Sequence, residues 1–113
     1  MKLVEFEPTS KITQHDSAGA TIAGVARASG VVRIALLRLD AGGVVGMHPA
    51  VGPQLFLVVA GEGVVWVEAE SRSITVSQAA LWQDSELHET TTRSGLTAVI
   101  VEADAIELIN APQ

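Results

Sequence analysis

The sequence predicts an all-β sandwich or barrel, and three observations support this fold class. Short runs with a period of two residues recur along the chain, whereas the 3.6-residue period of helices is hard to find. Glycine-containing turn signals separate these runs, at 28–30, 40–43, 61–63 and 93–95. The chain has 113 residues, which is the length of one domain with one core.

The expected strands follow one another along the chain, with turns or loops between them. Residues 9–20 are small and polar, so we expect a loop there after the first strand. The link Gly61-Glu62-Gly63 lies between two valine-rich runs and favours a β-hairpin. In chain order we expect strands at 2–7, 21–27, 31–39, 54–60, 64–68, 73–76, 79–82, 87–92 and 96–102, with a short last strand at 106–109.

This strand pattern also predicts the domain organisation. We expect a single domain over residues 1–113, with an N-terminal strand and loop at 1–20 and the barrel core at 31–102. Residues 110–113 lie beyond the last apolar run, and we expect them to fray. The sequence contains no internal repeat and no low-complexity segment.

Composition and charge exclude several classes of protein. The net charge is −6 and no cluster of Lys or Arg is present, so we expect neither nucleic acid nor an anionic membrane as a partner. The absence of cysteine excludes disulfides, thiolate metal ligands and cysteine nucleophiles. The charged start, residues 1–7, is unlike a secretory signal, and the five glycines of 41–61 disfavour a membrane helix there. We therefore expect a cytoplasmic protein.

Two of the expected strands are apolar on both faces, the runs 54–60 and 96–101. A strand that is covered on both sides lies either between two sheets or in a contact between subunits. The two runs therefore predict a homodimer.

Two of the three histidines have neighbours that suggest chemistry. His15 lies in a polar loop, and we expect it to be solvated. His48 ends the glycine-rich approach 42–47. His88 follows Glu86 by two residues, so these two side chains share a face if the segment is extended.

Gln54 is the third polar residue of interest. It shares a face with Phe56 and Val58 if the run is a strand. If that face lines a barrel interior, the Gln54 amide needs a metal, a ligand, a water or another side chain as its partner. We expect Phe56 and Val58, together with Leu36 and Val99, to make this interior apolar.

The spacing of residues 42–61 resembles the first motif of the cupin superfamily. Gly42, His48 and Gly61 fall where the pattern G-x5-H-x-H-x3-E-x6-G has its glycines and first histidine. The second motif, G-x5-P-x-G-x2-H-x3-N, would end on His88, which is its one match.

The chain also resembles small single-domain cupins in two further stretches, Pro53 to Gly63 and Trp82 to Glu89. Together the similarities cover residues 31–102. The resemblance implies a cupin-type double-stranded β-helix, which is a jelly-roll barrel, and this agrees with the strand pattern.

Cupins that bind metal use two histidines and a glutamate of the first motif and the histidine of the second. His48 and His88 keep two of these positions, whereas Ala50 replaces a histidine and Gln54 replaces the glutamate. Because a buried divalent ion generally needs an anionic ligand, Glu86 is the candidate carboxylate. His48, Gln54, His88 and Glu86 are thus the candidate ligands for Fe, Mn, Ni or Zn. Alternatively, Glu86 lies at the mouth of a turn and the site is weak or empty.

Three functions remain open at this point. The first is a metal-dependent enzyme on a small organic substrate, as the resemblance implies. The second is a non-catalytic cupin that binds a small-molecule ligand without metal. The third is a structural dimer with a remnant polar cluster. In either of the first two, Phe56, Val58 and Trp82 are expected to wall the ligand pocket.

Overall fold

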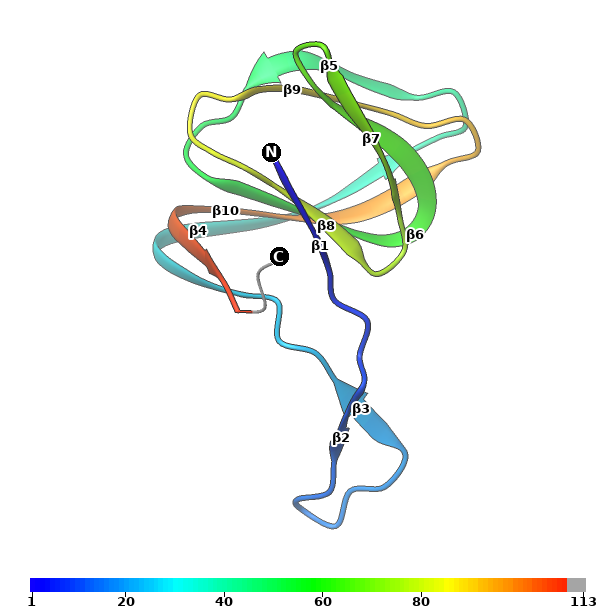
Figure 1. Ribbon diagram of the computed structural model, residues 1–113, viewed down its shortest axis with the longest axis vertical. Coiled ribbons are helices and arrows are strands. Elements are labelled where there is room, and N and C mark those ends of the chain that lie inside the picture. Colours follow the sequence, from blue (N-terminus) through cyan, green and yellow to red (C-terminus); the bar gives the residue numbers. More distant parts are fainter. Residues whose placement is uncertain (110–113) are drawn as a thin grey trace.

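The computed structural model describes residues 1–109, and these form antiparallel strands that wrap around one interior (Figure 1). The expected fraying of 110–113 lies outside the described residues. The strands are β1 (Lys2–Glu5), β2 (Ser10–Ile12), β3 (Ala20–Ile22), β4 (Ala26–Leu39), β5 (Val44–Pro49), β6 (Gln54–Val67), β7 (Glu70–Thr75), β8 (Gln78–Trp82), β9 (Leu87–Thr91) and β10 (Leu96–Leu108).

Strand β6 joins the two sides of the barrel. Its first half pairs with β8 and β10, within a sheet ordered β1-β8-β6-β10-β4. Its second half pairs with β7 and β9, and β9 in turn pairs with β5. The strands β2 and β3 form a separate small sheet. One long strand therefore contributes to both walls, which is how the jelly roll encloses its interior.

The expected hairpin at Gly61 is wrong, because β6 continues through it. Gly61 has a φ of 77° and lies so close to Gly95 that a side-chain carbon would clash with the Gly95 carbonyl oxygen. Glycine is thus required here for a left-handed backbone and a close approach within a strand, where the strand bends from one sheet to the other. The actual hairpin turn comes later, between Val67 and Glu70.

Several other strand predictions differ from the structure. The expected strand 21–27 is divided between the end of β3 and the start of β4, and 31–39 forms the rest of β4. The runs 96–102 and 106–109 contribute to one strand, β10. These long partners remain paired across a β-bulge, where Gly30 and Val31 lie opposite Asp104. The expected loop at 9–20 contains β2 and the start of β3, and β5 was not expected at all.

Apolar side chains form two clusters, one on each face of the larger sheet. Phe56 and Val58 belong to the inner cluster, as expected. Leu36 and Val99 were expected inside, but they pair on the other face of the sheet, and Leu36 is 77% exposed. The outer cluster is built on Val4, Leu55, Ala79 and Leu81. The side chains that enclose the candidate site come from the inner cluster.

Among residues 1–109 the structure contains no helix that is long and apolar enough to cross a membrane.

Candidate functional site

The structure brings His48 and His88 together, although 40 positions separate them in the sequence. β5 and β9 pair antiparallel with His48 directly opposite His88. Directly opposed residues project from the same face of a sheet, so both rings lie on one side. The ring centroids are 4.3 Å apart and the planes are tilted by 55°.

A β-bulge in β5 sets the orientation of His48. The register steps from Val45 opposite Thr90 to His48 opposite His88, so β5 has two intervening residues where β9 has one. Without the extra residue, position 47 instead of 48 would face His88. Bulges are common next to functional sites because they redirect a side chain in this way.

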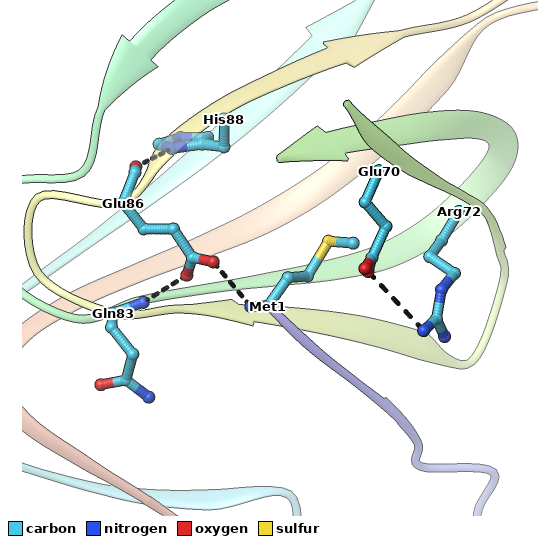
Figure 2. A network of polar contacts seen from close by, with 6 residues as sticks. All are labelled: Met1, Glu70, Arg72, Gln83, Glu86 and His88. Atoms are coloured by element: carbon cyan, nitrogen blue, oxygen red, sulfur yellow. Dashed lines mark hydrogen bonds and ion pairs between the residues drawn. The ribbon is translucent and has the colours of Figure 1, made fainter. Parts of the chain in front are cut away.

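Both imidazoles use Nδ1 to bind a backbone carbonyl. His48 Nδ1 lies 2.7 Å from the oxygen of Gly46, and His88 Nδ1 lies 3.1 Å from the oxygen of Glu86 (Figure 2). A carbonyl only accepts, so each Nδ1 must carry the proton. In the neutral rings, the lone pair therefore resides on Nε2. Histidines that bind metals show this same arrangement, with the other ring N–H donated to a carbonyl or a carboxylate.

His88 is held neutral by its surroundings. It is 3% exposed and stacks on Trp82 with ring centroids 4.1 Å apart. Burial lowers the pKa of His88, and the neighbouring His48 lowers it further, although the bond to the Glu86 carbonyl raises it. Phe56 supports the stack through an edge contact with Trp82 at 5.6 Å. His48 is more exposed, so it lies at the open side of the pair.

A cavity of about 70 Å³ lies beside the two rings. This volume is several times smaller than a pocket for a drug-sized ligand, which is roughly 300–1,000 Å³. The cavity therefore has room for an ion with one or two waters, or for a ligand of a few heavy atoms. Val58 lies in the inner cluster and is not among its lining residues. The lining includes His48, His88, Gln54, Thr90, Phe56 and Trp82.

Two polar side chains that line the cavity have no protein partner. Gln54 is 9% exposed as a residue, and no hydrogen bond of its side chain is found among residues 1–109, but its amide atoms are not among the buried unpaired ones. The indole Nε1 of Trp82 is buried without a hydrogen-bond partner in that part of the chain. The Gln54 amide is therefore open to an occupant of the cavity.

Glu86 does not join the two histidines. It lies in the turn before β9, and its carboxylate accepts hydrogen bonds from the Met1 ammonium at 2.7 Å and from the backbone N–H of Gln83 at 3.0 Å (Figure 2). Partial burial raises the pKa of Glu86, but the bonds from Met1 and Gln83 lower it more, and the net shift is downward. Glu86 is therefore an ionised carboxylate that already has cationic and amide partners.

The expected set of two histidines and one carboxylate is not formed in this structure. Within residues 1–109, no three His, Asp, Glu or Cys side chains lie close enough together to hold a metal ion. The candidate donors that line one cavity are the two imidazoles and the Gln54 amide. Imidazole suits Zn, Ni and Fe, so the two histidines fit such an ion, but this set lacks the anionic ligand that a buried divalent ion generally needs.

A larger hollow of about 460 Å³ lies away from the histidines, lined by residues such as Gly43, Glu62 and Arg93. Its lining contains no buried unpaired side-chain atom among the described residues. We therefore place the candidate site at the smaller cavity.

No protein-family model matches the sequence, and no curated protein matches it. Solved structures do match. A cupin-2 domain protein from Shewanella frigidimarina aligns with a TM-score of 0.58 at 11% identity, over 69% of this chain and 78% of that chain. A predicted oxalate decarboxylase from Thermotoga maritima aligns with a TM-score of 0.56 at 23% identity, over 67% of this chain and 65% of that chain.

The chain has the cupin fold. The fold expected from the motif resemblance is thus confirmed. A salicylate 1,2-dioxygenase from Pseudaminobacter salicylatoxidans also aligns, with a TM-score of 0.62 at 15% identity. The alignment covers 68% of this chain and 25% of the dioxygenase, so the chain spans about a quarter of that enzyme's length.

Proposed function

We propose that this cupin binds a divalent transition metal through the Nε2 atoms of His48 and His88, with the Gln54 amide oxygen as a third donor. The observation that carries the proposal is the pair of Nδ1 bonds to backbone carbonyls, which leaves both Nε2 lone pairs uncommitted. Neither Nε2 has a hydrogen-bond partner among residues 1–109. A histidine that merely satisfied itself within the core would use both ring nitrogens.

The burial of His88 supports the same proposal. Metal binding requires neutral imidazole, and the lowered pKa of His88 favours that form around neutral pH. His88 stacks on Trp82, which limits the rotation of its ring.

A bound metal would supply Lewis-acid polarisation of a small oxygen-containing ligand. His48 and His88 would orient the ion, and the Gln54 amide would bind the ion or donate to its ligand. The Trp82 indole N–H offers a further donor to an acceptor atom of that ligand. We propose that the ligand is a small organic molecule and that the activity is a metal-dependent reaction. The cavity of about 70 Å³ limits the ligand to a few heavy atoms.

The test is metal binding by tag-free protein, measured by calorimetry and elemental analysis after incubation with Zn, Ni, Mn or Fe. We expect about one ion per chain, and we expect His48→Ala to weaken binding by more than about 100-fold. His15→Ala is the matched control, because it removes an exposed loop histidine and should leave binding unchanged. Stoichiometric binding that survives His48→Ala would contradict the proposal.

The second candidate function is a metal-free cupin that binds a small molecule. It is favoured by the neutrality of the three donors and by the engagement of Glu86 with Met1. Its signature is a folded protein that takes up none of the four metals. Glu86→Gln examines the remaining alternative, in which Glu86 leaves Met1 and ligates the ion. A large loss of metal affinity in that variant would add Glu86 to the ligand set.

A further inference from the structure

Thr90 is a polar residue that lines the small cavity beside the histidines. It follows His88 by two positions in β9, so both side chains project from the same face of the strand. Thr90 is 3% exposed as a residue. Its hydroxyl has no hydrogen-bond partner among residues 1–109, yet it is not one of the fully buried unpaired atoms there. The Thr90 hydroxyl is therefore open to the cavity.

A second buried threonine shows how such a hydroxyl is satisfied within the protein. The Thr92 hydroxyl donates to the Glu62 carbonyl at 2.6 Å and accepts from the backbone N–H of Gly95 at 2.9 Å. Thr90 makes neither kind of bond within the described part of the chain, and in this it is like Gln54 on the facing wall. Because buried polar groups generally have a partner, Thr90 and Gln54 are both suited to an occupant of the cavity.

The charge of the candidate donors indicates what that occupant includes. A divalent ion on His48, His88 and Gln54 would keep its full charge, since all three donors are neutral. The burial of such a charge without an anion is unfavourable. Glu86 is bound to Met1, and no carboxylate of residues 1–109 joins the two histidines. The missing negative charge therefore has to come from a molecule in solution.

We propose that the site binds its metal ion together with one small anion, which binds the ion and accepts a hydrogen bond from the Thr90 hydroxyl. This proposal rests on the metal binding proposed above. The cavity of about 70 Å³ restricts the anion to a few heavy atoms, as in formate or azide. Thr90 is then the residue that recognises the anion, whereas the histidines hold the ion.

The metal ion and the anion should each strengthen the binding of the other. Opposite charges attract more strongly in a buried site than in water. By thermodynamic linkage, the anion raises the affinity for metal by the same factor by which the metal raises the affinity for the anion. The histidine rings are oriented by the carbonyls of Gly46 and Glu86, without any contact to Thr90. The effect of the anion is therefore separable from metal binding itself.

The experiment is calorimetry of Zn binding in buffers that differ only in their added anion. We expect formate and azide to tighten Zn binding by about tenfold or more relative to a bulky sulfonate. Benzoate should have no such effect, because it is too large for the cavity. The pH is held at about 6.5, because a zinc-bound water ionises at about pH 7 and its hydroxide would otherwise replace the anion. Equal Zn affinities in all buffers, or equal tightening by benzoate, would overturn the proposal.

Neighbouring threonines provide matched variants for the same titrations. Thr90→Val keeps the shape of the side chain and removes the hydroxyl. We expect its formate effect to fall to about twofold or less, with Zn affinity in sulfonate and stability in urea unchanged, because it loses no protein hydrogen bond. Thr91→Val is the control, since Thr91 lines the larger hollow instead of the cavity, and it should keep the formate effect. A Thr90→Val variant with the full formate effect would contradict the role of Thr90.

Gln54→Glu separates the charge argument from the hydrogen bond. It supplies the negative charge from the chain itself, so its Zn affinity should no longer respond to formate. A variant that responds as the wild type does would contradict the argument from charge. A wild type that takes up no Zn in any buffer would overturn the metal site and the anion together. Zn binding that ignores the added anion would overturn the anion alone.

Discussion

Two contacts set the charge and the tautomer of His88. Burial lowers the pKa of His88 and so disfavours its charged form, whereas the bond to the Glu86 carbonyl raises the pKa but holds the proton on Nδ1. In the neutral ring, Nε2 is therefore the basic atom. The Gly46 carbonyl holds Nδ1 of His48 in the same way.

This neutrality predicts how stability depends on pH. Because the pKa of His88 is lowered from its ordinary value of 6.5, the unfolded chain binds more protons than the folded chain just below that pH. The free energy of unfolding should therefore fall as the pH drops from about 7 to about 5. We expect His88→Phe, which keeps a ring against Trp82, to show a shallower fall in urea titrations. An equally steep fall in the variant would show that other groups cause it.

The charge of residue 54 should control metal affinity. Gln54→Glu adds an anionic donor beside the two imidazoles, and we expect it to tighten Zn binding by about tenfold or more. Without metal, the new carboxylate is buried, so the variant should be less stable than the wild type by roughly 1–3 kcal/mol. Calorimetry and chemical unfolding measure the two effects. A variant that binds Zn no more tightly would place Gln54 outside the set of ligands.

At the scale of single elements, the bend in β6 depends on one glycine. Gly61→Ala would force a side chain against the Gly95 carbonyl in a left-handed conformation, and we expect a loss of about 2 kcal/mol or more in unfolding free energy. Gly42→Ala is the control, because Gly42 has a φ of 80° with no atom near its missing side chain. It should lose only about 1 kcal/mol. Equal losses would show that the close approach to Gly95 is relieved at little cost.

The errors in the predicted elements have physical causes. Gly61 and Gly63 give the local signal of a turn. In the structure, however, the left-handed backbone of Gly61 and its close approach to Gly95 bend a strand that remains continuous. β5 has three glycines in or just before it, and its bulge breaks the two-residue alternation by which strands are found. The expected strands 79–82 and 87–92, by contrast, lie within one residue of the actual bounds of β8 and β9.

The candidate site was predictable in part, because some of its residues follow a known spacing. His48, His88 and Gln54 were found because their spacing resembles a motif, and the structure places them around one cavity. The partner of Glu86 was invisible in the sequence, since Met1 lies 85 positions away and no local pattern connects them. The indole Nε1 of Trp82 is buried without a hydrogen-bond partner among the described residues. The burial of one atom depends on tertiary packing, so the pattern of the sequence does not predict it.

For the whole molecule, metal binding should be coupled to folding. A ligand that binds only the folded chain raises its stability by about 2.7 kcal/mol when present at 100 times its Kd. We therefore expect Zn or Ni to raise the thermal midpoint of the wild type, and to leave that of His48→Ala nearly unchanged. A shift of the same size in His48→Ala would assign the stabilisation to another part of the molecule.

The central claim is that His48 and His88 present bare Nε2 atoms to one metal ion. Nitrogen-15 NMR of the histidine rings measures this directly, because it distinguishes the protonated from the bare nitrogen. We predict that both rings carry their proton on Nδ1 in metal-free protein, and that Zn shifts the Nε2 signals of His48 and His88 together while His15 stays unchanged. Protons on Nε2, or signals that do not respond to Zn, would contradict the account.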